Sequence, residues 1–246
     1  PANGQVYTGA AVAAPDYYSY LAKIRQGMNG SWNYQLAFSS QQHPGAPLFL
    51  YYLALGRAAA LLGLGAQAAY HLARLLNGLL LFASLYVFIG FFTDSLKERR
   101  YLFLFAALTS GLGWLAMLAG HLTTSDLSIA ESNPFYSLLA AAHFPLSAAA
   151  MLAFFILLLL PPVAALPRQF LHWLALTLVS ALLMLLQPFM AAVFLTAGGV
   201  YLLAAWRLGR RFPWLIFWRL ALATAVCILL ALWTWQMVNR DPFLAN

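Results

Sequence analysis

Charged side chains are scarce in this chain of 246 residues. Lysine and arginine together number 13, aspartate and glutamate number 6, and charged residues make up 8% of the sequence. Soluble domains are about 25% charged and roughly 45–50% apolar, whereas 63% of this chain is apolar. So few charges cannot cover the surface of a soluble protein of this size. A soluble enzyme, a nucleic-acid-binding module and a disordered chain are therefore excluded.

Cysteine and the common catalytic motifs are also missing or nearly so. The single cysteine, Cys227, lies in an apolar run, which excludes an intrachain disulfide. The sequence contains no Walker loop, no GxGxxG, no HExxH and no GxSxG. Nucleotide hydrolysis, dinucleotide chemistry and zinc proteolysis therefore have no support. No internal repeat is evident, and neither is the inverted symmetry of many transporters.

The two ends of the sequence predict a fragment. The chain begins at Pro1 without a methionine, and its first residues lack the basic, apolar and small-residue pattern of a signal peptide. It ends at Asn246 in a polar loop. We expect an N-terminal spanning helix and a C-terminal part to be missing.

Long apolar runs are what the chain has in abundance. A spanning helix needs about 20 apolar residues to cross the hydrocarbon of a bilayer. The run at 170–206 is too long for one span, and we expect a tight turn at Gln187-Pro188 to divide it. Six spans are predicted, at 75–93, 101–120, 135–160, 170–186, 188–206 and 214–238. Residues 239–246 are then a truncated outer loop.

The charges in the loops predict the orientation. Three loops are basic, namely 94–100, 161–169 and 207–213, whereas the loop 121–134 carries only Asp126 and Glu131. By the positive-inside rule the basic loops face the cytoplasm and the acidic loop lies outside. The net charge of +7 fits basic loops that face anionic lipid headgroups. Alternation through six spans places residues 1–74 outside as well.

This outer segment is expected to hold two interfacial helices. The first spans 16–28 and has one apolar stripe, made by Tyr17, Tyr20, Leu21, Ile24 and Met28. Ser19, Lys23 and Gln26 fall opposite the stripe, and Asp16 after Pro15 is placed to cap the first turn.

The second interfacial helix is predicted at 47–62. Its 16 residues reach only about 24 Å, and Arg57 near its middle would cost about 2.5–3.5 kcal/mol inside the membrane. We therefore expect this helix to lie along the outer interface and not to cross.

The order of these segments resembles a known superfamily. The arrangement is DYYSYLAKIRQGMNGSW, then QQHPGAPLFLYYLALG, then a helix that opens with Arg74. It resembles the first half of membrane glycosyltransferases of the GT-C fold, such as the protein O-mannosyltransferases and the lipid A aminoarabinose transferases. In such enzymes an acidic residue of the first outer loop lies at the active site, beside two juxtamembrane helices. Asp16 matches that position, and the second acidic position of the next outer loop corresponds to Asp126 or Glu131.

One corner departs from the family pattern. Some members carry an acidic residue, a lysine and a proline before the second juxtamembrane helix, where this chain has Gln42, His43 and Pro44. This departure changes the charge of the segment before the second juxtamembrane helix. His43 is interpreted either as a simple turn residue or as a replacement for the lysine as a phosphate contact.

Each acidic candidate has two interpretations. Asp16 is either a helix cap or a general base that deprotonates an acceptor hydroxyl, which attacks the sugar as a lipid phosphate leaves. Asp126 and Glu131 are either solvated loop residues or carboxylates that orient the acceptor or bind a divalent cation. No other cofactor is indicated, and two carboxylates without fixed spacing are weak evidence for a metal.

The basic candidates of the outer layer are Lys23, Arg25, Arg57 and Arg74. They contact either lipid headgroups or the phosphate of a polyprenyl-phosphate sugar. Arg57 and Arg74 are the better phosphate candidates because they lie where apolar helices meet the interface. His143, eight residues into its predicted span, is either a functional cavity residue or a histidine bonded to a neighbouring helix.

Taken together, these patterns predict an all-α, polytopic membrane helix bundle of GT-C-like architecture. The expected function is sugar transfer from a polyprenyl-phosphate donor to an unidentified acceptor on the outer side of a prokaryotic plasma membrane. The expected partners are that donor and the lipid bilayer, and no nucleic acid. The alternative is a non-catalytic transporter, lipid-binding protein or flippase. Charge concentrated in loops and one outer layer favours interfacial chemistry over a secondary transporter.

Overall fold

The computed structural model describes residues 9–10, 14–36, 38–108, 111, 113–120, 124, 129–130, 133–162, 165–209 and 211–245. In these ranges the prediction of an all-helical fold is confirmed, because no strand is present and the one backbone bridge pairs Tyr34 with Ala46. The helices are α1 (Ala14–Met28), α2 (Leu50–Leu61), α3 (Ala66–Ile89), α4 (Leu96–Leu108), α5 (Gly113–Leu118), α7 (Pro134–Ala140), α8 (His143–Leu159), α9 (Leu166–Leu186), α10 (Pro188–Gly209) and α11 (Trp214–Asn239).

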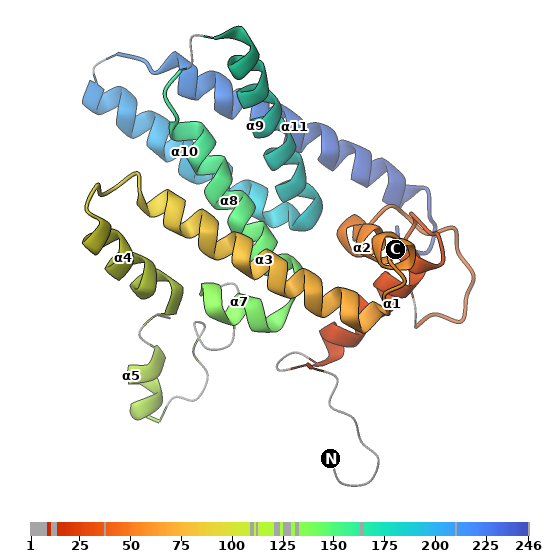
Figure 1. Cartoon of the computed structure of the whole chain (residues 1–246). Helices are drawn as coiled ribbons and strands as arrows, with labels where there is room; N and C mark the ends of the chain where they lie inside the picture. Colours follow the sequence, from red (N-terminus) through yellow and green to blue (C-terminus); the bar gives the residue numbers. More distant parts are fainter. Residues whose placement is uncertain are drawn as a thin grey trace.

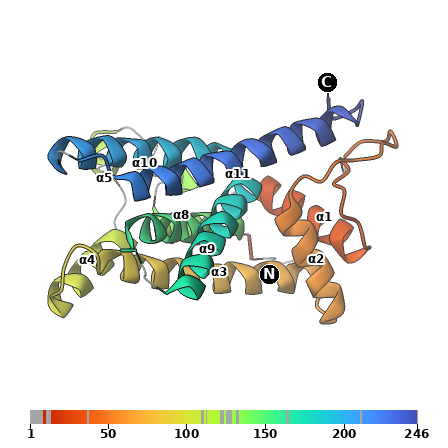
Figure 2. The same cartoon turned by 90° about the horizontal axis from the view of Figure 1, so that it is seen from above.

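Four of these helices have the length and composition of membrane spans. They are α3, α9, α10 and α11. Figure 2 shows α3 on one side of the molecule, α10 and α11 on the other, and α8 and α9 between them. Large apolar side chains such as Leu79 and Leu229 remain exposed along these helices, as expected for surfaces that contact lipid. The protein is a membrane helical bundle.

The predicted span 101–120 is wrong as a single helix. The structure has α4, which begins earlier and is 13 residues long, and the separate short helix α5. At 1.5 Å per residue α4 reaches only about 20 Å. Gly111 and Gly113 lie where the helix is interrupted, and glycine costs about 1 kcal/mol relative to alanine inside a helix.

The predicted span 135–160 is also divided. Asn133 caps α7 by accepting a hydrogen bond from the Tyr136 N–H at 2.6 Å, but α7 ends at Ala140 and Ala141 is extended. A new helix, α8, begins at His143. Pro145 explains the break, because in a continuous helix its ring would clash with the carbonyl of Ala141. His143 therefore opens a helix and does not lie within one.

The bundle core lies among α8, α9, α10 and α11. Phe154 and Phe194 are fully buried there, with ring centroids 4.4 Å apart, and Leu176, Leu183 and Ala223 surround them. Lipid is as apolar as these side chains, so close van der Waals packing, more than escape from water, stabilises such a core.

Helices α1 and α2 pack at one end of the bundle, beside the C-terminus (Figure 1). They approach each other backbone to backbone at two glycines. A Cβ on Gly27 would lie 2.1 Å from the Leu53 carbonyl oxygen, and one on Gly56 would lie 2.0 Å from the Ile24 carbonyl oxygen. Only residues without a side chain permit this crossing.

Two details of α1 differ from the prediction. The helix begins at Ala14, so Asp16 lies inside the first turn and is not the capping residue. Its charge still complements the positive end of the helix dipole. Lys23, predicted on the polar face, is buried, because Tyr34 and Phe49 from the segment before α2 cover that face with aromatic rings.

Candidate functional site at the α1–α2 end

An aromatic cluster fills the place where α1, α2 and the first turns of α3 meet. Tyr17, Tyr52 and Tyr70 are buried. Tyr20 stacks on Tyr52 with centroids 4.6 Å apart, and Tyr17 meets Tyr70 edge-on at 5.0 Å. Such pairs add about 0.5–1.5 kcal/mol each beyond the area that they bury. The cluster fixes α1 and α2 against α3.

Polar groups connect this cluster to the junction of α7 and α8. The Tyr52 hydroxyl lies 2.7 Å from Nδ1 of His143, and the Asn77 amide donates to the Tyr51 hydroxyl at 2.7 Å and to the Ala142 carbonyl at 2.8 Å. Burial raises the pKa of Tyr51 to about 12 and the pKa of Tyr52 well above its ordinary value. Both phenols are therefore protonated at neutral pH. His143 is held as a link between α2 and α8.

Asp16 and Arg74 lie on this same end of the bundle. The Asp16 carboxylate is exposed in the first turn of α1. The next residue, Tyr17, packs against Tyr70 of α3, and Arg74 lies one turn after Tyr70 on the same helix. Arg74 also donates to the carbonyls of Gly9 and Leu139, each at 3.4 Å. The structure therefore places an exposed carboxylate and a half-buried guanidinium at the same end of the bundle.

Lys23 occupies an aromatic cage. Its ammonium nitrogen lies 4.0 Å from the ring centroid of Phe49, 5.0 Å from that of Tyr20 and 5.5 Å from that of Tyr34, and it donates to the Ser19 hydroxyl at 2.8 Å. Burial lowers the pKa of Lys23, and the negative charge of Asp16 partly offsets this. Contacts of a cation with aromatic faces contribute about 0.5–2 kcal/mol each.

The backbone of Phe49 is strained at this cage. Its φ of 53° lies in the left-handed region, which a bulky residue rarely adopts. Such conformations persist where the surroundings hold them. Here Lys23 lies over the Phe49 ring, and Tyr34 packs against it edge-on at 4.9 Å.

Two other basic candidates lie away from Asp16. Arg57 donates to the Gly30 carbonyl and lies 4.9 Å from the Trp32 ring centroid, just past the C-terminal end of α1. Gly30 follows Asp16 by 14 residues, so this position is about 20 Å along the helix axis. Arg25 is exposed in the last turn of α1. Of the two stronger phosphate candidates, Arg74 is the one near Asp16.

His43 is part of a buried pair that sequence reasoning missed. Its Nδ1 lies 2.6 Å from Oδ2 of Asp241, beyond the end of α11, and the ring stacks on Phe243 with centroids 5.0 Å apart. Because the Leu36 N–H donates to Nε2 at 3.0 Å, Nε2 carries no proton and Nδ1–H is the donor to Asp241. His43 is therefore a structural link and does not stand open as a phosphate contact.

Asp241 is fully buried and accepts hydrogen bonds from several directions. Burial alone would raise its pKa, but His43 and the backbone N–H groups of Phe243, Gly45 and Leu244 outweigh burial and lower it. The predicted topology was the one sign of this contact in the sequence, since residues 239–246 and 1–74 were both expected on the outer side of the membrane.

Asp126 and Glu131 lie outside the described residues. Within the described ranges no group of three His, Cys, Asp or Glu side chains is close enough to hold a metal ion. Comparisons of the chain with protein-family models, with curated proteins and with solved structures found no match.

Proposed function

We propose that the protein is a membrane glycosyltransferase of GT-C-like architecture, with its site at the α1–α2 end of the bundle. The donor is a polyprenyl-phosphate sugar, and Asp16 is the general base. The observation that carries this proposal is that Asp16 and Arg74 lie at the same end of the bundle, on either side of the contact between Tyr17 and Tyr70. A base and a cation near one point are what such a transfer requires.

The chemistry divides between these two residues. The Asp16 carboxylate takes the proton of an acceptor hydroxyl, whose oxygen forms a bond to the anomeric carbon of the sugar. The bond from that carbon to the phosphate oxygen breaks, and polyprenyl phosphate leaves with the electron pair. Arg74 stabilises the negative charge that develops on the phosphate. The exposure of Asp16 keeps it accessible to an acceptor.

A lipid donor also needs an apolar surface near its phosphate. A cavity of about 200 Å³ lies among α3, α7, α8 and α10, and its lining is mostly apolar, including Leu81, Phe144 and Met151. Leu81 follows Arg74 by seven residues, about 10 Å along α3. This cavity is suited to the isoprenoid units nearest the phosphate.

The test is sugar transfer by the full-length protein in proteoliposomes with labelled polyprenyl-phosphate sugars. General-base catalysis contributes about 10²–10⁴-fold, so Asp16→Asn is expected to lower the rate by at least about 100-fold. The matched control is Asp94→Asn, which makes the same change at an exposed aspartate between α3 and α4. Asp94→Asn should transfer at the wild-type rate. Equal rates for Asp16→Asn and wild type would remove Asp16 as the base.

A further inference from the structure

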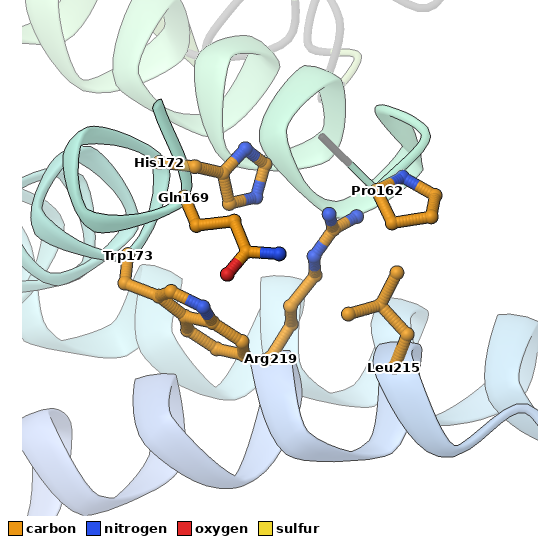
Figure 3. A pocket seen from close by; sticks show the side chains of 6 residues that line it. All are labelled: Pro162, Gln169, His172, Trp173, Leu215 and Arg219. Carbon is orange, nitrogen blue, oxygen red and sulfur yellow. The ribbon is translucent and has the colours of Figure 1, made fainter. Parts of the chain in front are cut away.

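A polar cavity lies at the other end of the bundle, where α8, α9 and α11 meet. It measures about 250 Å³ and is lined by Pro162, Gln169, His172, Trp173, Leu215 and Arg219. Figure 3 shows the Gln169 amide, the His172 ring and the Arg219 guanidinium turned toward the same space. None of the six lining residues is acidic. The cavity therefore has a positive charge without a carboxylate beside it.

The hydrogen bonds of this cavity are incomplete. Arg219 is only 3% exposed, and its Nη1 donates to the carbonyls of Leu158 and Leu160 at 2.8 and 2.6 Å, at the end of α8. Its Nε is buried and has no partner among the residues that the structure describes. A buried donor without a partner destabilises the fold, and more so when it is charged. An anion in the cavity would satisfy the free donor of Arg219.

An apolar groove continues from this cavity. It lies between α9 and α11, has a volume of about 660 Å³ and is lined by Phe170, Trp173, Leu174, Thr177, Trp218, Ala221 and Leu222. Trp173 lines both the cavity and the groove. A ligand that fits both has an anionic head and a hydrocarbon chain.

The position of the cavity along the bundle matches the level of the lipid headgroups. Trp206, Trp214 and Trp218 are exposed at this end of α10 and α11, and tryptophan is enriched where membranes meet water. Exposed Arg168 and Arg211 lie at the same end. We propose that the cavity and the groove together bind one anionic phospholipid, with its phosphate at Arg219, His172 and Gln169 and an acyl chain along the groove.

The test uses the full chain, purified in detergent and titrated with phosphatidylglycerol while the Tm is measured. Binding to the folded state alone raises the Tm in a concentration-dependent way. Gln169→Glu places a negative charge at the rim of the cavity, and because Gln169 is exposed the fold should tolerate it. We expect the apparent affinity for phosphatidylglycerol to fall about tenfold.

The matched control is Arg168→Gln, which changes the net charge by the same amount one residue away but lies outside the cavity lining. It should change the affinity by less than about threefold. Arg219→Gln should abolish the rise in Tm if the variant folds. Because Arg219 also caps α8, the decisive comparison is that of Gln169→Glu with Arg168→Gln.

Three results would overturn the assignment. Equal losses of affinity for phosphatidylglycerol in Gln169→Glu and Arg168→Gln would show only a general attraction of anionic lipid to the basic end of the bundle. An equal rise in Tm with zwitterionic phosphatidylcholine would remove the preference for an anion. An equal rise with inorganic phosphate at the same concentration would show a phosphate site without a lipid chain.

Discussion

The two ends of the bundle treat their buried polar groups in opposite ways. At the α1–α2 end, Lys23 contacts three aromatic rings and a hydroxyl, and Asp241 accepts hydrogen bonds from His43 and several backbone groups. At the other end, Arg219 keeps a buried Nε that has no partner in the described part of the chain. At the first end the buried charges of Lys23 and Asp241 both have partners within the protein, whereas Arg219 at the second end has a donor left for a ligand.

The largest loss of stability is expected at the glycine crossing of α1 and α2. Gly27→Ala and Gly56→Ala would each force a Cβ to within about 2 Å of a backbone carbonyl oxygen, and overpacking costs about 1–3 kcal/mol. Thermal unfolding in detergent measures the effect. Gly199→Ala in α10 is the control, because a Cβ there meets no atom within 4 Å. A similar Tm for Gly56→Ala and Gly199→Ala would contradict the close crossing.

The next largest loss of stability is expected at the pair of His43 and Asp241. In Asp241→Asn an amide NH₂ replaces one oxygen and must face the donors of His43 or Phe243, so the segment 31–46 should lose protection from hydrogen exchange. Because the pKa of Asp241 is below its ordinary 3.8, the stabilisation is complete at neutral pH and is lost as the pH falls below about 4. Asp94→Asn is the control. Unchanged exchange of 31–46 would refute the link.

A smaller loss is expected at the contact of Tyr52 with His143. Tyr52→Phe keeps the buried ring and removes only the hydroxyl, which should cost about 0.5–1.5 kcal/mol. Tyr18→Phe, at a tyrosine that is 53% exposed, should leave the Tm unchanged. If the two variants unfold alike, the hydrogen bond contributes nothing.

The smallest change in stability is expected at Lys23. Lys23→Met keeps the volume and removes a charge that burial disfavours, so stability should stay equal or rise. Because the pKa of Lys23 is lowered from 10.5, the wild type should gain stability as the pH rises from the folded-state pKa toward 10.5. The methionine variant should lack this slope. A marked loss of Tm in Lys23→Met would show that the cage needs the cation.

Apolar run length and amphipathic spacing were enough to predict an all-helical membrane protein and the helix at α1. They could not predict the breaks, since Gly111 and Pro145 act locally within long apolar runs. Nor could they predict the cage around Lys23, because helical spacing shows which face a residue lies on but not which loop covers that face. The pair of His43 and Asp241 joins positions 198 residues apart, a contact that only the tertiary fold creates.

We expect sugar transfer to depend on the α1–α2 end and not on the lipid cavity. The direct measurement is the transfer rate of Asp16→Asn and Gln169→Glu, side by side in the same proteoliposomes. Asp16→Asn should be slower by at least about 100-fold, and Gln169→Glu should stay within about threefold of wild type. Wild-type transfer by Asp16→Asn would remove Asp16 as the base, and an equal loss in both variants would show that transfer does not depend on the α1–α2 end alone.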